Sequence, residues 1–252
     1  MPQNAVRKIG LARALSKLGY CSRSQAAELI RDGRVRLNGS VRRDPETPVR
    51  LEHDRITVNG MAVEAQQKIY LMMNKPRGLV TTASDEKGRE TVYTLLEKAD
   101  AALPWVAPVG RLDKASEGLL LLTNDSEWAA RVTAPETHLK KIYHVQITTV
   151  ADESLMASLR EGVQGDDGDC LRASRASILR TGEKNCWLEI VLDEGKNRQI
   201  RRMLAVFDVE VLRLVRIAIG PLQLGQLGKG EYRALTREEK QKLDAAMGRK
   251  SI

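Results

Sequence analysis

The apolar residues of this chain come in short runs that are separated by polar and charged segments. Leu119–Leu122 is among the longest runs, with four residues, whereas a membrane-spanning helix needs roughly 18 consecutive apolar residues. The first ten residues, MPQNAVRKIG, contain no apolar stretch of the kind found in a secretory signal peptide. We therefore expect a soluble, non-secreted, cytoplasmic protein whose interior is built from short strands and helices.

After residue 68, segments with the pattern of strands alternate with segments that have helical spacing of apolar residues. Strands in groups that are interrupted by helices are typical of an α+β domain with a largely antiparallel, mixed sheet flanked by helices. We predict strands over residues 69–73, 118–123, 142–148, 171–179, 187–192 and 211–217, and helices over residues 91–99, 126–132, 153–162 and 197–206.

The N-terminal part follows a different pattern, with two short helices before a small sheet. Leucine and alanine recur at helical spacing from Ile9 to Leu18, which predicts the first helix. Ser22 and Gln25 have the spacing of a capping box, which predicts the start of the second helix. Asn38-Gly39 is a strong signal for a two-residue hairpin turn between short strands. We therefore predict a small N-terminal α/β unit.

This N-terminal part also carries most of the net positive charge. The whole chain has 41 Lys and Arg against 33 Asp and Glu, and residues 1–66 alone hold 12 against 7. A basic stretch is either a solvated surface or a contact surface for a polyanion. A short polar linker follows, so we predict two domains, residues 1–66 and 67–252.

The segment Cys21–Gly39, CSRSQAAELIRDGRVRLNG, resembles the S4 RNA-binding domain. The resemblance implies that residues 1–66 bind structured RNA through side chains that contact phosphates. The basic side chains on or beside the two predicted helices are Arg13, Lys17, Arg23, Arg31, Arg34 and Arg36.

The segment Val109–Asp125, VGRLDKASEGLLLLTND, places Arg111 and Asp113 in a loop directly before an apolar strand. Alone, an Arg-x-Asp sequence is most often a turn ion pair of little consequence. The whole segment, however, resembles the catalytic loop of pseudouridine synthases, in the branch that carries an S4 domain and modifies ribosomal RNA. The chain departs from many of these relatives at Glu117, where they have Ser or Thr.

Two later segments resemble further motifs of the same family and follow in the same order. Lys141-Ile142-Tyr143 opens a predicted strand, and Glu194–Met203, EGKNRQIRRM, opens a predicted helix. In the second motif Arg198 stands where some branches have His. Because three motifs and an upstream S4-like segment agree, we identify the chain as an S4-domain ribosomal RNA pseudouridine synthase with the corresponding two-domain α+β fold.

The resemblance implies a role for each of five residues. Asp113 is the catalytic carboxylate, acting either as a nucleophile at the sugar or as a base that removes a sugar proton. Arg201 keeps it ionised through a bidentate contact. Tyr143 stacks on the flipped-out uracil and relays the proton from C5. Arg111 occupies the space of the extruded uridine or holds phosphate, and Leu212 packs on the other face of the base.

We expect neither a cofactor nor a metal. Isomerisation of uridine to pseudouridine conserves all atoms and involves no net redox change, so the reaction needs no cofactor. The three cysteines and three histidines form no CxxC or HExxH spacing. The expected partner is ribosomal RNA, free or in an assembly intermediate, and we expect a monomer with no membrane contact.

Several alternatives remain open at the level of sequence. The forms GRLD…SEGLLLLTN and NRQIRRM favour 23S over 16S ribosomal RNA, but the target uridine itself is chosen by RNA shape. A non-catalytic RNA-binding or ribosome-assembly factor would need only the basic N-terminal part. A glycoside hydrolase would need two carboxylates, for which Asp113 and Glu117 are the candidates.

Overall fold

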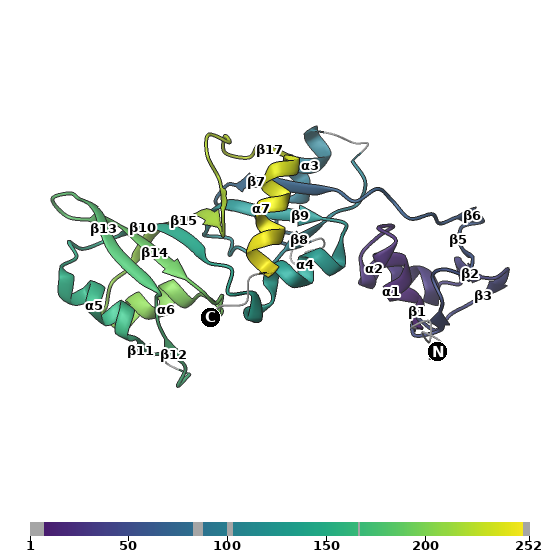
Figure 1. Ribbon diagram of the computed structural model, residues 1–252, viewed down its shortest axis with the longest axis horizontal. Coiled ribbons are helices and arrows are strands. Elements are labelled where there is room, and N and C mark those ends of the chain that lie inside the picture. Colours follow the sequence, from purple (N-terminus) through teal and green to yellow (C-terminus); the bar gives the residue numbers. More distant parts are fainter. Residues whose placement is uncertain (1–7, 83–87, 100–102, 166, 249–252) are drawn as a thin grey trace.

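The computed structural model describes residues 8–82, 88–99, 103–165 and 167–248 of the 252-residue chain. Its helices and strands form a small N-terminal group and a larger group, which lie side by side (Figure 1). The described residues contain no helix long and apolar enough to cross a membrane.

The N-terminal group packs two helices against a small antiparallel sheet with strand order β3-β2-β5-β6. The predicted capping box is present, because Ser22 and Gln25 each accept a hydrogen bond from the other's backbone N–H, at 3.1 and 3.0 Å. The first helix begins two residues later than predicted, since Ile9 pairs with Val49 as a short strand. The elements are β1 (Ile9–Gly10), α1 (Leu11–Lys17), α2 (Arg23–Arg31), β2 (Val35–Leu37), β3 (Ser40–Val41), β4 (Pro48–Val49), β5 (Ile56–Val58) and β6 (Met61–Ala62).

The N-terminal group has a hydrophobic core of its own, formed by buried residues between Leu11 and Val58. Its contacts to the larger group include polar ones. The ammonium group of Lys68 donates to the carbonyl of Lys17 at 3.3 Å. The ammonium group of Lys17 lies 2.7 Å from the Glu127 carboxylate, across the boundary between the groups.

The larger group is built on a nine-stranded mixed sheet, as predicted. Its strands follow the order β13-β14-β10-β15-β9-β7-β17, with β16 beside β15 and β8 beside β9. All named strand pairs are antiparallel except β9 with β15. The strands are β7 (Tyr70–Lys75), β8 (Ala107–Val109), β9 (Glu117–Thr123), β10 (Lys141–Ile147), β13 (Arg175–Thr181), β14 (Cys186–Leu192), β15 (Val211–Ile219), β16 (Leu222–Gln223) and β17 (Tyr232–Ala234).

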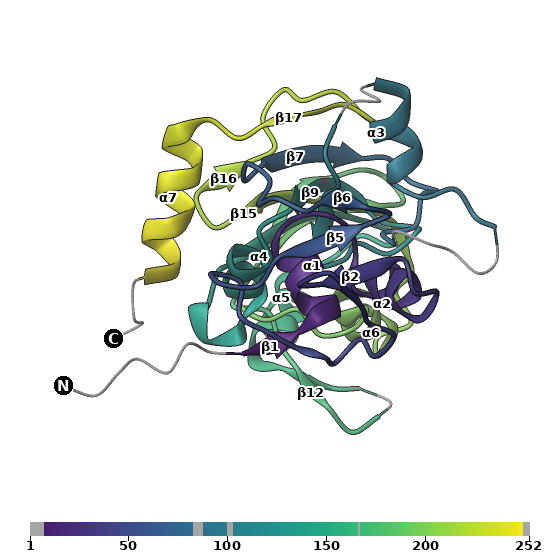
Figure 2. The ribbon, with the colours of Figure 1, turned by 90° about the vertical axis from the view of Figure 1, so that its right-hand side faces the viewer.

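Helices cover both faces of this sheet. Alternate leucines of β9 belong to two different buried clusters, one that includes residues of α3 and one that includes residues of α4 and α7. Accordingly, α3 and α7 lie on opposite sides of β7 and β9 (Figure 2). The remaining elements are α3 (Tyr93–Ala99), α4 (Ser126–Thr133), the 3₁₀ turn η1 (Pro135–Thr137), α5 (Glu153–Glu161), β11 (Val163–Gln164), β12 (Cys170–Leu171), α6 (Gln199–Ala205) and α7 (Arg237–Gly248).

Several elements of the larger group differ from the sequence prediction. The strand predicted over residues 171–179 is split into β12 and β13, because Ala173 donates its N–H to the carbonyl of Leu159 at the end of α5 instead of to a strand. Helix α6 starts at Gln199, because Arg198 has a left-handed backbone with φ of 48°. Helix α7 was not predicted, since its apolar face is short and consists of Leu243, which is fully buried, with Ala246 and Met247 packed against the same cluster.

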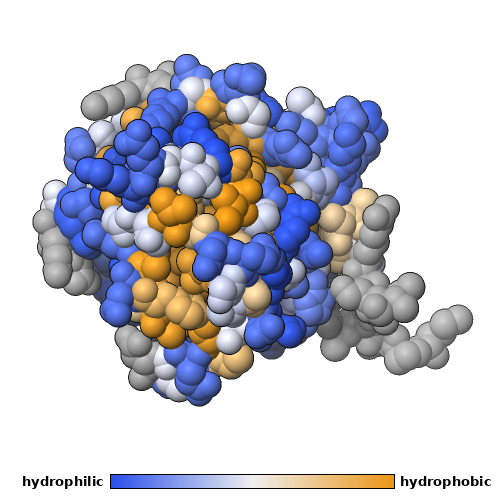
Figure 3. All heavy atoms as spheres, turned by 90° about the vertical axis from the view of Figure 1, so that its left-hand side faces the viewer, coloured by the Kyte–Doolittle hydropathy of each residue, from blue (hydrophilic) through white to orange (hydrophobic). Residues whose placement is uncertain are grey.

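Strand β13 forms one edge of the large sheet. Ile178 and Leu179 expose 36% and 45% of their surface there, and hydrophobic surface surrounded by hydrophilic residues is visible at this end of the molecule (Figure 3). The register of β13 shifts between Ile178 and Arg180, and the strand also carries Arg175. Bulges and charged residues are features that hinder edge-to-edge pairing of sheets.

Gly118 is the point where the two halves of the sheet come together. It pairs with Arg216 in the parallel connection of β9 to β15, which contains only two residue pairs. Its φ is +100°, and a Cβ atom there would lie 2.3 Å from the carbonyl oxygen of Arg216. Only glycine permits both this backbone conformation and this approach.

We predict that Gly118→Ala lowers the free energy of unfolding by about 2–4 kcal/mol more than Gly78→Ala. Gly78 has nearly the same φ, +102°, but no atom lies within 4 Å of its would-be Cβ. It therefore carries only the backbone strain. Urea unfolding of both variants measures the difference, and equal losses would contradict the close approach at Gly118.

Candidate active site

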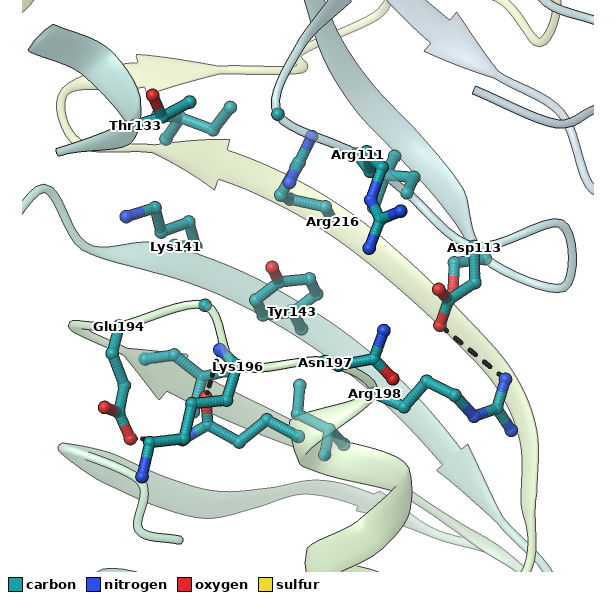
Figure 4. Close-up of a pocket in the computed structure, with 18 of the residues that line it drawn as sticks. Arg111, Asp113, Thr133, Lys141, Tyr143, Glu194, Lys196, Asn197, Arg198 and Arg216 are labelled. Atoms are coloured by element: carbon teal, nitrogen blue, oxygen red, sulfur yellow. Dashed lines mark hydrogen bonds and ion pairs between the residues drawn. The ribbon is translucent and has the colours of Figure 1, made fainter. Parts of the chain in front are cut away.

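A cavity of about 590 Å³ opens beside the loop that precedes β9 (Figure 4). Its walls come from this loop, from β10 and β15, and from the segment that leads into α6. Six cationic and three acidic side chains line it, so its charge suits a polyanionic ligand. The predicted site residues that line the cavity are Arg111, Asp113, Tyr143 and Arg201.

The loop that carries Asp113 is held by a buried lysine. Lys75, the last residue of β7, is completely buried, and its ammonium group donates to the carbonyls of Pro76, Asp113 and Ser116 at 3.1, 3.2 and 2.9 Å. Burial lowers the pKa of Lys75 to about 8, even though Asp113 and Glu117 favour its charged form. The backbone of the loop is thereby fixed to the end of a core strand.

The side chain of Asp113 lies at one end of the cavity and is about one third exposed. A guanidinium nitrogen of Arg198 lies 3.8 Å from its Oδ2 (Figure 4). Arg198 adopts its left-handed backbone at the residue before α6, which aims the side chain across the cavity from the opposite half of the sheet. The charged neighbour of Asp113 is therefore Arg198, a residue that sequence reasoning had noted only as a departure from relatives.

Arg201 makes contacts other than the predicted bidentate one. Its two terminal nitrogens donate to the carbonyls of Val211 and Ala115 at 3.2 and 3.3 Å, and its buried Nε has no hydrogen-bond partner among the described residues. Burial, and then the charge of Arg198, lower the pKa of Arg201, whereas Asp113 acts in the opposite direction. Its role as the partner of Asp113 stays a prediction.

Leu212 is not among the residues that line the cavity, and its predicted contact with the base stays a prediction. It is 36% exposed, and Leu214, two residues later and 7% exposed, faces the cavity together with Tyr143. The reason is a β-bulge: the register of β10 against β15 shifts between Gln146 and Ile147, and Leu212 lies at that shift. Spacing along the sequence alone does not reveal such a bulge.

Glu117 points away from the cavity. Its carboxylate accepts hydrogen bonds from Arg213 at 3.0 and 2.9 Å, and the ammonium group of Lys229 lies 3.0 Å away. Burial disfavours the charge of Glu117, but these cations outweigh it and lower the pKa. Because Glu117 does not line the cavity with Asp113, the paired carboxylates that a glycoside hydrolase needs are not formed by these two residues.

The predicted RNA-binding residues of the N-terminal group fall into two classes. Lys17 is engaged with Glu127 of the larger group, and this contact lowers the pKa of Glu127. The remaining five, which are exposed side chains, are Arg13, Arg23, Arg31, Arg34 and Arg36.

Three further residues near the site escaped sequence reasoning. Lys75 ends a strand that begins with apolar residues, YLMMNK, and a lysine directly after such a run is the available signal for a buried functional group. Lys141 and Arg216 also line the cavity, and each lies within one strand of Tyr143, on β10 and β15. No group of three or more His, Cys, Asp or Glu side chains suited to a metal ion occurs within the described ranges.

Comparison with known proteins identifies the family. Residues 69–206 match the family described as RNA pseudouridylate synthase, and residues 9–56 match the S4 domain. The chain belongs to the RNA pseudouridine synthase family. The predicted family, enzyme class and α+β fold are therefore confirmed.

Individual relatives agree along nearly the whole chain. An uncharacterized RNA pseudouridine synthase of Aquifex aeolicus (strain VF5) is 37% identical over 97% of each chain. Ribosomal large subunit pseudouridine synthase B of Bacillus subtilis (strain 168) is 34% identical over 93% of this chain and 95% of its own. A crystal structure titled pseudouridylate synthase superposes with a TM-score of 0.65 at 30% identity, covering 93% of this chain and 99% of that chain.

We predict that Lys75→Met destabilises the protein by about 2–4 kcal/mol, because three carbonyls in a closely packed region lose their donor. The loop with Asp113 should then shift, and pseudouridine formation should fall at least about tenfold. Lys114→Met is the matched control, since Lys114 is exposed in the same loop. Thermal unfolding and a tritium-release assay measure both effects, and equal behaviour of the two variants would remove Lys75 from this role.

Proposed function

We propose that this protein converts a specific uridine of ribosomal RNA to pseudouridine, with 23S ribosomal RNA as the target. The observation that carries the proposal is the cavity in which Asp113, Tyr143 and a set of cations come together from three separate segments of the chain. The similarity to a Bacillus subtilis enzyme named for the large ribosomal subunit supports the choice of 23S. Because such RNA is made in the cytoplasm, we propose that the protein acts there.

The chemistry begins with extrusion of the uridine, since its C1′ and C5 are inaccessible in stacked RNA. The Asp113 carboxylate is one third exposed at one end of the cavity, so it is free to approach the ribose. There it attacks C1′ as a nucleophile or removes the proton from C2′. Either route cleaves the glycosidic bond, after which the uracil turns and joins C1′ through C5.

Cations on the opposite wall support this role for Asp113. A carboxylate in a closed site tends to take up a proton, and nearby positive charge opposes this. Arg198 supplies such a charge at 3.8 Å, and Arg201 lies behind it in the same wall. We propose that RNA binding draws Arg201 into contact with Asp113, because its buried Nε has no partner to lose among the described residues.

The aromatic ring of Tyr143 is suited to hold the extruded base. It is only 8% exposed, on β10, and Leu214 on the neighbouring strand lines the same cavity. We propose that uracil lies between these two side chains and that the Tyr143 hydroxyl accepts or relays the proton from C5. Arg111 lines the cavity on the Asp113 side and is proposed to hold the displaced strand.

We further propose that residues 1–66 form the RNA-docking domain and residues 67–252 the catalytic domain. The separate hydrophobic core of the N-terminal group and the S4 match over residues 9–56 support this boundary. The five exposed arginines would contact phosphates, whereas Lys17 would fix the orientation of the docking domain through Glu127.

Asp113→Asn tests the chemical step. We predict that it lowers tritium release from ribosomal RNA labelled at uridine C5 by about 10²- to 10⁴-fold, because the amide neither attacks nor accepts a proton. Glu183→Gln removes a negative charge from an exposed turn far along the chain and should retain full activity. If Asp113→Asn released tritium as fast as the wild-type protein, the catalytic role proposed for Asp113 would be wrong.

Deletion of the gene tests the target. Mapping of pseudouridine in ribosomal RNA from cells with and without this gene should reveal a site lost from 23S and restored by the wild-type protein but not by Asp113→Asn. Loss from 16S alone would overturn the choice of subunit. Loss from neither would favour a non-catalytic role in ribosome assembly.

A further inference from the structure

Two cations of the cavity are not used by the proposed chemistry. Lys141 lies on β10, two residues before Tyr143, and Arg216 on β15 pairs directly with Tyr143. Both line the cavity, so they project from the same face of the sheet as Tyr143. In Figure 4 the Tyr143 ring lies between Lys141 and Asp113, which puts Lys141 at the far end of the cavity.

The Arg216 guanidinium is buried and only partly satisfied. Arg216 as a whole residue is 6% exposed, and its Nε donates to the carbonyl of Leu119 at 2.7 Å. One terminal nitrogen, Nη2, is fully buried and has no hydrogen-bond partner among the described residues. Burying a charged donor without an acceptor destabilises the protein. An oxygen atom of a bound ligand would supply the missing hydrogen bond.

Lys141 adds a second positive charge at this end. No hydrogen bond or ion pair joins its ammonium group to any residue in the described ranges. Burial, and then the charge of Arg216, lower the pKa of Lys141, whereas Asp193 acts in the opposite direction. Lys141 and Arg216 line the same cavity from the neighbouring strands β10 and β15, so an anion between them would offset the repulsion of their charges.

Two acidic residues, Asp193 and Glu194, line the cavity as well, and among the described residues no ion pair joins either of them to Lys141 or Arg216. Glu194 accepts a hydrogen bond from Gln199 at 3.0 Å, and the buried Oδ1 of Asp193 has no hydrogen-bond partner within the part of the chain that the structure describes. Lys141 and Arg216 therefore keep positive charge that no carboxylate pairs with directly. The neutral carbonyl edge of a uracil would satisfy hydrogen bonds but would not balance this charge, whereas a phosphate does both.

We propose that Lys141 and Arg216 bind a phosphate group of the RNA strand next to the extruded uridine. This inference rests on the proposed function, because it takes the occupant of the cavity to be a nucleotide. The planar guanidinium offers two donors to a phosphate and the ammonium group offers a point charge beside it. With the phosphate fixed at one end and Asp113 at the other, the nucleotide has one orientation across Tyr143.

The test compares three probes, UMP, uridine and inorganic phosphate, by ligand-observed NMR titration of the full-length protein at low ionic strength. UMP should bind at least about tenfold more tightly than uridine, a difference of about 1.4 kcal/mol. Inorganic phosphate should displace UMP. Equal affinity for UMP and uridine would overturn the proposal and would favour a base-edge contact at this end.

Variants assign the effect to the site. Lys141→Gln should remove most of the preference for UMP over uridine, while Lys140→Gln, the same charge change at the exposed neighbouring residue, should keep it. Arg216→Lys retains the positive charge but loses the planar guanidinium with its paired donors. It should weaken the binding of UMP about tenfold and leave the binding of uridine unchanged. If Lys140→Gln and Lys141→Gln lower the preference equally, the effect is general electrostatics and the site is refuted.

The outcome is separable from that of the proposed function. Binding of the probes requires no turnover and is measured in the Asp113→Asn variant as well as in wild type. A UMP preference that depends on Lys141, together with no pseudouridine formation, would refute the function and leave the anion site. Pseudouridine formation without a UMP preference would refute the anion site alone.

Discussion

The ammonium group of Lys75 fixes the position of the loop that carries Asp113. Three backbone carbonyls converge on it, two of them from the loop itself, and the lysine is the last residue of β7, which lies between β9 and β17 in the sheet. An error in the pairing of β7 with β9, where Lys75 faces Gly118, would move the lysine and the loop together. The geometry at Asp113 is therefore set by strand register, and not by the loop sequence alone.

The remainder of the cavity is made from the other half of the sheet. Tyr143 and Leu214 come from β10 and β15, and Arg198 comes from the turn before α6. These residues are far from Asp113 in sequence, so each contact depends on long-range packing. The sheet on one side and the short helix α6 on the other hold these groups in place.

Much of this arrangement could be predicted from the sequence where local chemistry decides it. The capping box at Ser22 and the mixed sheet follow from patterns of a few residues, and motif order brought Asp113, Tyr143 and Arg201 into one site. The misses have non-local causes. The β-bulge at Leu212 depends on pairing with β10, and the role of Lys75 is visible only when the carbonyls of Asp113 and Ser116, distant in sequence, meet its side chain.

The parallel connection between β9 and β15 has a mechanical consequence. It is two residue pairs wide, the narrowest link along the path of the sheet, and the cavity straddles it. The Glu117 carboxylate of β9 also accepts two hydrogen bonds from Arg213 of β15, and these bonds cross the same connection. Because Asp113 and Arg198 lie on opposite sides of this connection, their separation of 3.8 Å depends on how the two halves of the sheet are held together there.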